Sequence, residues 1–492
     1  MDKMKMETPD LTQENVEKLL ALFPECATEV KQHGKVTRGV NFDILQQLIT
    51  PYKMEGDEAY EFTWVGKREA IVEANRPIRK TLRPVPEKSK EWQKTENLYI
   101  EGDNLEALKL LREAYLGQVK MIYIDPPYNT GNDFIYNDSF KMSEEELAEG
   151  MGLFDEEGNK RFTENSVTNP RFHSDWCSMI YSRLRLVKNL LSEDGAIFIS
   201  IDDNEQENLK KICDEVFGAS NFIAQLIWER AYSPKNDARF ISNSHDYVLM
   251  YAKSIEDFVI GRLPRSAQAN ARYKNPDNDP RGVWKPSDMS VKTYNAACDY
   301  PITCPSGRIV EPPAGRCWRL SANAFAERLH DNRIWFGPDG NSVPCIKRFL
   351  SELKFNGMAP ASILFYKEVG HSQEGAQEVA KLMEGAYFDG PKPLRLLRRL
   401  LTLANLNKES LVLDFFSGSA TTAHAVMQMN AEDGGHRRFI MVQLPEKTDE
   451  KSEAKKAGFD TICDIGEERI RRAGEKIKAE SPLTTKELDT GF

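Results

Sequence analysis

The sequence has few features of membrane, secreted or fibrous proteins. Its 492 residues contain no apolar run near the ~20 residues that a membrane-spanning helix needs. The N-terminal stretch MDKMKMETPD lacks the apolar segment of a signal peptide, so we expect a cytoplasmic protein with no membrane contact. Hydrophobic residues make up 40% and charged residues 29% of the chain, which favours a globular protein of about two to four domains.

Cysteine pairs are also missing. Eight cysteines in 492 residues are too sparse for a disulfide scaffold, and none of them form a C-x-x-C pair. Four lie in one stretch, at Cys298, Cys304, Cys317 and Cys345, but their spacing matches no common zinc-binding pattern. Because no other cluster of metal-ligand residues stands out, the sequence predicts reduced thiols and no metal site.

Positive charge is scarce over most of the chain but not in its middle. The net charge is −10, yet the segment from Arg230 to Lys367 contains 20 Lys and Arg against 13 Asp and Glu. This segment therefore has a net charge of +7, and the rest of the chain has −17. A basic block in an acidic chain fits an ordinary surface with a modest surplus, or a surface that binds nucleic acid.

Hydrophobic periodicity predicts alternating strands and helices on both sides of an irregular block. Residues 97–128 and 174–217 each show apolar strand runs next to amphipathic helix patterns, and the same alternation returns in residues 394–444. Between these parts the chain is rich in Pro, Gly and Arg. We therefore predict an α/β protein with one mostly parallel, doubly wound sheet and an inserted module.

The same patterns suggest domain boundaries. The predicted parts are a helical N-terminal region at 1–65, a first half of the sheet domain at 66–229, an insertion at 230–385, a second half at 386–475 and a polar, frayed tail at 476–492.

A first candidate site is Asp125-Pro126-Pro127-Tyr128, at the end of the predicted strand VKMIYI. In open α/β sheets, ligands bind beyond the carboxyl ends of the strands. The two prolines stiffen the backbone and leave carbonyl groups free to accept hydrogen bonds. A fixed carboxylate beside such carbonyls can accept an exocyclic amine, and the aromatic ring can stack on a base. The bland alternative is a rigid turn.

Two further turns carry small or acidic residues. Asp414 to Thr422, with the sequence DFFSGSATT, lies between a predicted strand and a predicted helix, where the backbone can approach a ligand and the helix N-terminus favours an anion. It is neither a G-x-G-x-x-G fingerprint nor a phosphate-binding P-loop. Gly102-Asp103-Asn104 follows another strand, and Asp103 can either cap the next helix or contact a ligand.

Together these motifs resemble the S-adenosylmethionine-dependent amino-methyltransferases that act on DNA. DPPY precedes the glycine motif, which is the order of the β class, a circular permutation of the usual methyltransferase sheet. More closely, TENLYIEGDNLEALKLL, YIDPPYNTGNDFIYND, FISIDDNE, FSGSATTAHAV and FIMVQLPE are similar to the modification subunits of type III restriction–modification systems, over about residues 60–475. The resemblance implies a Rossmann-like fold and adenine-specific N6 methylation of double-stranded DNA.

The resemblance also implies roles for single residues. Asp125 and the carbonyl of Pro126 would hold the target amine, with Pro127 shaping the turn and Tyr128 stacking on the flipped base. The residues implied for the cofactor are Asp103, Asn104, Trp176, Asp414, Phe415, Phe416, Gly418, Ser419, Thr421, Gln443 and Glu446.

Two positions depart from the family pattern. Ala420 stands where many relatives have a third glycine, and we expect the geometry of a helix start to suit alanine. Gln443 stands where an acid commonly grips the ribose of the cofactor, and Glu446 is three residues further on. The sequence leaves open which of the two residues makes this contact.

The resemblance identifies the block at 230–385 as a target-recognition domain. Its basic side chains would meet the phosphates of the duplex, with Arg230, Lys235 and Arg239 at its entry as DNA-binding candidates. Such subunits usually form homodimers and work with a separate restriction subunit. The chain has no G-x-x-x-x-G-K-[ST] motif and no convincing nuclease carboxylate cluster, so DNA cleavage would belong to another chain.

Two alternative functions stay open from the sequence. One is methylation of cytosine N4, although relatives that perform it typically have Ser in place of Asp125. The other is a catalytically silent DNA-recognition subunit, which the intact DPPY motif argues against.

Overall fold

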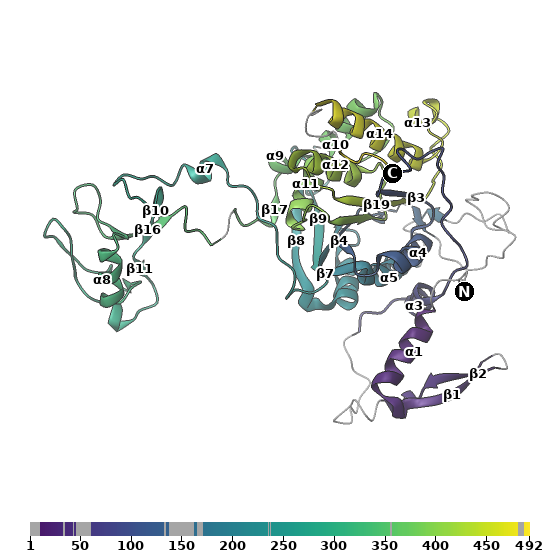
Figure 1. Ribbon diagram of the computed structural model, residues 1–492, viewed down its shortest axis with the longest axis horizontal. Helices are drawn as coiled ribbons and strands as arrows, with labels where there is room; N and C mark the ends of the chain where they lie inside the picture. Colours follow the sequence, from purple (N-terminus) through teal and green to yellow (C-terminus); the bar gives the residue numbers. More distant parts are fainter. Residues whose placement is uncertain are drawn as a thin grey trace. The chain divides into compact units, whose positions relative to one another are not determined.

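The chain divides into two compact units in the computed structural model (Figure 1). Unit 1 comprises Met1–Gly261 and Ala361–Phe492, and unit 2 comprises Arg262–Pro360. The structure describes residues 10–32, 35–42, 44–45, 61–131, 134–136, 162–164, 171–234, 236, 238–354, 357–480 and 487–492.

Unit 1 is built on an eight-stranded sheet with the order β17-β8-β9-β7-β4-β18-β19-β3. All neighbouring strands are parallel except β9, which runs antiparallel to both β7 and β8. The strands are β3 (Leu98–Glu101), β4 (Val119–Ile124), β7 (Leu191–Ile201), β8 (Phe222–Glu229), β9 (His245–Ala252), β17 (Ile363–Leu364), β18 (Leu411–Asp414) and β19 (Arg438–Gln443). Their central members are continuous apolar runs, as expected for parallel strands that are buried on both faces.

Helices cover both faces of this sheet (Figure 1). The helices α3, α4 and α5 pack together on one face, while α11, α12 and α14 pack together on the other. The helices of unit 1 that flank the sheet are α3 (Lys67–Asn75), α4 (Asn104–Tyr115), α5 (Phe172–Leu190), α6 (Gln206–Cys213), α9 (Tyr366–Val369), α10 (Ser372–Met383), α11 (Leu394–Leu403), α12 (Thr421–Asp433), α13 (Glu453–Lys456) and α14 (Ile462–Glu480). Across the described parts of the chain, no helix combines the length and apolarity needed to cross a bilayer.

The two halves of the sheet domain join within one sheet. Strands β18 and β19 come from the second half of the sequence, yet they lie between β4 and β3 of the first half. This confirms the predicted α/β fold, a mostly parallel Rossmann-like sheet in permuted order. The carboxyl ends of β4, β18, β19 and β3 therefore meet at one edge, where the residues of the DPPY, glycine and GDN motifs follow.

Unit 2 is a small β-rich body with its own core. Its three-stranded sheet has the order β10-β16-β15, and two further two-stranded ribbons pair β11 with β14 and β12 with β13. Its elements are α7 (Ala267–Asn270), β10 (Trp284–Asp288), β11 (Ser290–Val291), β12 (Ile302–Thr303), β13 (Ile309–Val310), β14 (Cys317–Trp318), α8 (Ala322–His330), β15 (Ile334–Trp335) and β16 (Cys345–Phe349). The core gathers Trp318, Phe325, Phe336 and Ile346, among others.

Unit 2, at Arg262–Pro360, is shorter than the insertion at 230–385 that the sequence predicts. The flanking segments belong to unit 1, because β9 pairs with β7 and β8, and β17 extends the same sheet beyond β8. Their pattern is hard to recognise in sequence because β17 has two residues and α9 has four.

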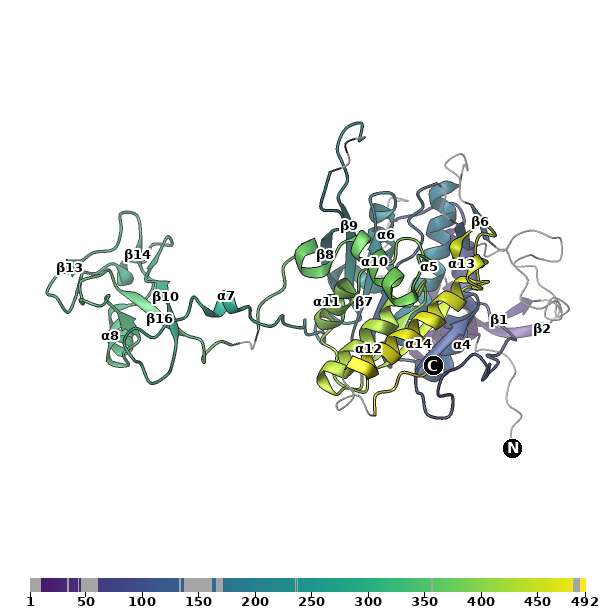
Figure 2. The same cartoon turned by 90° about the horizontal axis from the view of Figure 1, so that it is seen from above.

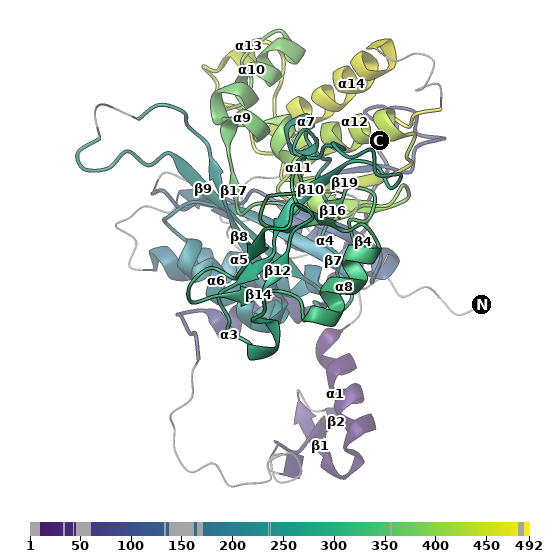
Figure 3. The ribbon, with the colours of Figure 1, turned by 90° about the vertical axis from the view of Figure 1, so that its left-hand side faces the viewer.

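The chain ends differ from the sequence-based expectation. Helix α1 (Leu11–Leu22) forms, but β1 (Ala27–Gln32) and β2 (Lys35–Val40) make a hairpin beside it, where the prediction was helix (Figure 3). Helix α14 continues to Glu480, and the backbone of Phe492 exchanges hydrogen bonds of 3.0 and 3.1 Å with that of Lys90. The last six residues are thus docked rather than frayed. Residues 1–9, 33–34, 43 and 46–60 of the region predicted to be helical lie outside the described residues.

Candidate active site

Asp125 follows β4 directly, and both of its carboxylate oxygens accept hydrogen bonds. The Tyr128 hydroxyl donates to Oδ1 at 3.0 Å, and the Lys392 ammonium donates to Oδ2 at 2.5 Å. Burial and the charge of Asp125 raise the pKa of Tyr128 well above 10, so its hydroxyl remains a donor. The carbonyl of Pro126 receives no hydrogen bond from the described residues, so it is available to a ligand.

Side chains of α5 and of the segment before α6 hold the backbone around Tyr128 by hydrogen bonds. The Trp176 indole donates to the Pro127 carbonyl at 2.7 Å, and the ring itself is fully buried. Asn129 adopts a left-handed φ of 60°, which asparagine tolerates better than most residues, and donates to Glu205 at 2.5 Å. Trp176 was expected in the cofactor pocket, but in the structure it offers no surface to a ligand and instead holds the DPPY turn.

The glycine motif forms a tight turn between β18 and α12. Asp414 accepts the Phe416 N–H at 3.1 Å and the Thr422 hydroxyl at 2.6 Å, and burial raises its pKa to about 7. Gly418 has a left-handed φ of +51°, and a Cβ added there would lie 3.0 Å from the Phe388 ring.

Hydrogen bonds from Arg469 of α14 hold the start of α12. The guanidinium of Arg469, on α14, donates to Ser419 Oγ at 2.8 Å and to Thr421 Oγ at 2.6 Å, while Phe415 is fully buried beneath the turn. Ala420 adopts φ +60° and ψ +39°, so the expectation that it has ordinary helix-start geometry is wrong. A left-handed alanine costs about 1–2 kcal/mol, which the surrounding packing must offset.

The GDN motif links the turn after β3 to the glycine motif. Asp103 caps α4 by accepting the Glu106 N–H at 3.1 Å, which is the bland role that the sequence allowed. The Asn104 amide donates to the Phe415 carbonyl at 2.9 Å, and the buried Arg183 donates to Asn104 at 2.5 Å. The carboxyl ends of β3 and β18 are therefore tied together side by side.

Gln443 and Glu446 differ in how their side chains are engaged. Gln443 is buried and accepts the Gly418 N–H at 2.7 Å, so its amide oxygen already holds the glycine turn. Within the described residues, no hydrogen bond reaches the Glu446 carboxylate, and desolvation alone raises its pKa to about 7. A desolvated carboxylate without a partner at this edge is suited to accept hydroxyl donors from a ligand.

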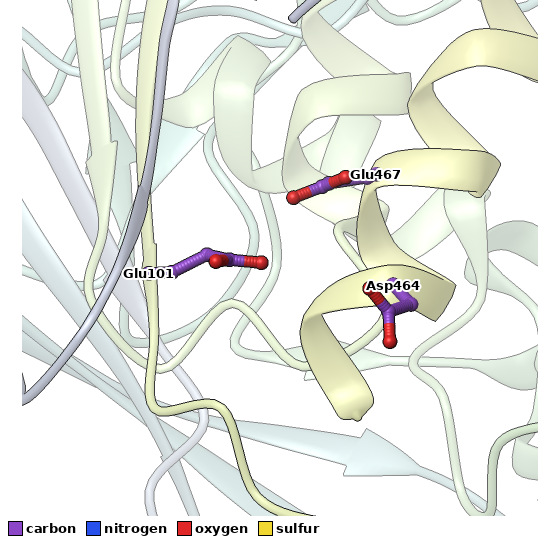
Figure 4. A group of neighbouring side chains, drawn as sticks. All are labelled: Glu101, Asp464 and Glu467. Carbon is purple, nitrogen blue, oxygen red and sulfur yellow. The ribbon is translucent and has the colours of Figure 1, made fainter. Parts of the chain in front are cut away.

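A cluster of three carboxylates lies at the end of β3 and on α14. Figure 4 shows Glu101, Asp464 and Glu467 turned toward one another, and no other set of three ligand-type side chains comes as close in the described chain. The Lys88 ammonium lies 2.7 Å from Glu101 and 3.4 Å from Asp464. Burial, with the nearby Glu101 charge, raises the pKa of Glu467 to about 7. The Lys88 ammonium therefore offsets part of the negative charge of this cluster.

Comparison with known proteins gives the family. A sequence model of the DNA methylase family (N6_N4_Mtase) matches residues 119–471, well over half of the chain. The chain belongs to the DNA methylase family. Within it, the chain is similar to the Mod subunits of type III restriction–modification enzymes, and the resemblance indicated by its motifs is confirmed. Enzymes of this family use S-adenosylmethionine as cofactor.

The matches to individual relatives cover most of this chain. The StyLTI Mod subunit of Salmonella typhimurium is 36% identical over 435 residues, which cover 87% of this chain and 65% of the relative. The EcoPI Mod subunit of Escherichia phage P1 is 33% identical over 500 residues, covering 95% of this chain and 75% of the relative. Among solved structures, the M1.HpyAVI–S-adenosylmethionine complex is 13% identical, covers 76% of this chain and 98% of its own, and has a TM-score of 0.32.

Of the three basic residues predicted to bind DNA, Arg230 is bound within the protein and Arg239 is exposed. Arg230 pairs with the buried Asp246 at 2.8 Å, and burial raises the pKa of Asp246 to about 6. Arg239 is exposed and lies 5.0 Å from the ring of Phe240, in the loop between β8 and β9 that projects in Figure 2. Lys235 lies outside the described residues.

Sequence reasoning missed three residues of the methylase site, which are Lys392, Arg183 and Arg469. Each is a buried or nearly buried cation that reaches a predicted site residue from a distant segment. The Pro-Lys-Pro sequence around Lys392, just before a predicted helix, is the only signal that could have drawn attention to it.

Proposed function

We propose that this chain transfers the methyl group of S-adenosylmethionine to adenine N6 in double-stranded DNA, as the modification subunit of a type III restriction–modification system. The observation that carries the proposal is the position of Asp125 and Tyr128 at the carboxyl edge of β4, beside the glycine turn of β18. The simplest test is incorporation of a tritiated methyl group from S-adenosylmethionine into duplex DNA, with heat-inactivated protein as control. No incorporation over a range of DNA sequences would refute the proposal.

The carboxyl edge of β18, β19 and β3 fits S-adenosylmethionine. No side chain caps the N-terminus of α12, which leaves backbone N–H groups for the cofactor's carboxylate. Gly418 allows close approach, Phe416 lies at the turn, and Asp103 follows β3 where the family places its adenine contact. We assign the ribose hydroxyls to Glu446, because Gln443 is already engaged by Gly418.

The bound cofactor supplies an electrophilic methyl group on a sulfonium. Asp125 and the Pro126 carbonyl accept hydrogen bonds from the two N–H groups of the target amine. These bonds draw its nitrogen toward sp³ character and direct the lone pair at the methyl carbon. Tyr128 stacks on the adenine, which must be flipped out of the duplex at a cost of a few kcal/mol. Holding the reacting atoms in line can supply about 7–11 kcal/mol of the barrier.

The assignment of Glu446 predicts a pH dependence of cofactor binding. Ribose hydroxyls donate to a carboxylate, so binding favours the deprotonated form of a group whose pKa is about 7 in the free protein. Affinity should therefore fall as the pH is lowered from 8 to 6, approaching about tenfold per pH unit below the pKa. Calorimetric titration at several pH values measures this dependence.

The Glu446→Gln variant is the control for that titration. Glutamine keeps an acceptor oxygen but has no proton to lose, so this variant should bind the cofactor with a flatter pH profile. An unchanged slope in Glu446→Gln would assign the titration to another group.

Unit 2 presents the basic surface that we assign to DNA. It contains 15 Lys and Arg against nine Asp and Glu, and eight Lys and Arg side chains are among the residues that line a groove of about 750 Å³. Five of these cations have no ion pair with any described residue, and they are Arg265, Lys285, Arg319, Arg328 and Arg348. Arg333 and Lys347, in contrast, are paired with carboxylates inside the unit.

DNA binding should weaken steeply with salt, although the chain as a whole is acidic. If these five cations each meet a phosphate, the log–log slope of affinity against salt is about −4.5. Fluorescence anisotropy with a labelled duplex measures the slope, and Lys285→Ala with Arg348→Ala should make it less steep by about two. A flat salt dependence, or an unchanged slope in that double variant, would contradict the assignment of unit 2.

The partners and location follow from the same proposal. We expect a homodimer in the cytoplasm, where DNA is accessible and the eight cysteines, all free in the structure, stay reduced. A separate restriction subunit would supply translocation and cleavage.

A further inference from the structure

Lys392 contacts the two residues that the proposed mechanism assigns to the target amine. Its ammonium donates to Asp125 Oδ2 at 2.5 Å and lies 5.1 Å from the centre of the Tyr128 ring. An adenine amine stacked on Tyr128 and bonded to Asp125 would have the same two neighbours. A nitrogen donor of this chain is thus already in contact with the residues that bind the substrate.

The segment that presents Lys392 is held firmly. Pro391 and Pro393 flank it, and Gly375 of α10 packs so closely that an added Cβ would lie 2.2 Å from the Pro391 carbonyl. Glu378 accepts the Leu394 N–H at 2.8 Å at the start of α11. The side chain of Lys392 is only 10% exposed, and its ammonium also lies 5.9 Å from the Trp228 ring. A lysine restrained in this way stays in place without a ligand.

Other acidic side chains lie near Asp125, and a nearby cation offsets their negative charge. Burial brings several acids close together, and Asp246 and Asp414 each interact with the negative charge of Asp125. Several titratable and charged groups face this pocket from different elements. They are Tyr123 on β4, Asp125 and Tyr128 after β4, Asp202 after β7, Arg230 after β8, Asp246 on β9, Asp414 on β18, and Lys392. Arg230 is bound to Asp246, so Lys392 is the described cation that bonds Asp125 directly.

We propose that Lys392 is a positioning residue for methyl transfer, which holds the Asp125 carboxylate in its orientation while the target amine bonds to it. A carboxylate has about four acceptor positions, of which Tyr128 and Lys392 use two, so the amine can bond without displacing either. This inference rests on the proposed role of Asp125, and it assigns to Lys392 no contact with the reacting atoms.

The test compares three variants of the full-length protein. Lys392→Met keeps an apolar stem beside Tyr128 and Trp228 but removes the charge, and Lys392→Arg keeps the charge. Lys381→Met, at an exposed lysine in the last turn of α10, is the matched control for loss of one positive charge. For each variant, kcat is measured at pH 7.5 with saturating DNA, together with the KM for DNA, cofactor affinity and melting temperature.

For Lys392→Met we expect kcat at pH 7.5 to fall about 10- to 100-fold, the usual effect of losing a hydrogen bond to a charged group. Cofactor affinity should stay within threefold. Lys392→Arg should recover part of kcat, because it restores a cationic donor to Asp125.

Several results would overturn the inference. They are a kcat of Lys392→Met within threefold of wild type, no recovery of kcat in Lys392→Arg, or a loss of cofactor affinity and melting temperature in proportion to kcat. If the wild-type protein transfers no methyl group to DNA, the proposed function itself fails. If the wild type is active and Lys392→Met behaves like Lys381→Met, only the role of Lys392 fails.

Discussion

Replacement of Asp125 by alanine should lower methyl transfer about a thousandfold or more and leave cofactor binding within a few fold. In the proposed mechanism the carboxylate accepts the substrate amine. It lies at the end of β4, whereas the residues proposed for the cofactor follow β18, β19 and β3. Loss of a single preorganised group that stabilises a transition state commonly costs about 10²–10³ in kcat, and here the anionic acceptor itself is lost. A tritiated-methyl assay measures transfer, and calorimetry measures cofactor affinity.

The Asp257→Ala variant is a suitable control for Asp125→Ala. Asp257 is an exposed acid of the same unit that bonds only the neighbouring Ser254 among the contacts described. This variant should transfer methyl groups like the wild type. If Asp125→Ala lost cofactor binding with its fold unchanged, the carboxylate would belong to the cofactor site, and the proposed role would be refuted.

Gly418→Val should have the opposite effect, with cofactor affinity reduced about 100-fold, or about 2.8 kcal/mol, and DNA binding largely kept. A side chain at this position would lie 3.0 Å from Phe388, and β-branching would add bulk in the space left for the cofactor. The backbone there is also left-handed, with φ +51°, which a β-branched residue rarely adopts. A thermal-shift titration with S-adenosylmethionine measures the loss.

Gly434→Val separates backbone strain from occupied space. Gly434 follows the end of α12, the helix that begins after the Gly418 turn. It has a φ of +64°, and an added Cβ would meet nothing within 4 Å. Both valines strain the backbone and should lower stability similarly, by about 1–2 kcal/mol. Only Gly418→Val should lose cofactor affinity; equal affinities in the two variants would show that the glycine turn is only a connection.

Local patterns were sufficient to predict the elements that carry the site. VKMIYI, SLVLDFF and RRFIMVQL are apolar runs that end at turn or acidic residues, and each forms a strand of the central sheet. Because parallel strands share one carboxyl edge, their following residues meet there. The DPPY, glycine and GDN motifs were therefore brought together as the sequence predicts.

Contacts that depend on distant segments could not be predicted in the same way. Lys392 lies 267 positions from Asp125, and Arg469 is 50 from Ser419, so no local pattern indicates either contact. Trp176 has the residue type of a cofactor contact, but its position on the inner face of α5 buries it. The left-handed backbone of Ala420 is set by the packing of the turn, which sequence propensity does not report.

Identification of the methylated base tests the central claim most directly. DNA incubated with the protein and S-adenosylmethionine is digested to nucleosides, and the products are separated by mass spectrometry. N6-methyladenine should be the main product, absent when Asp125→Ala replaces the wild type. C5 methylation of cytosine requires a cysteine nucleophile, and the DPPY segment contains none. N4-methylcytosine as the main product would contradict the account.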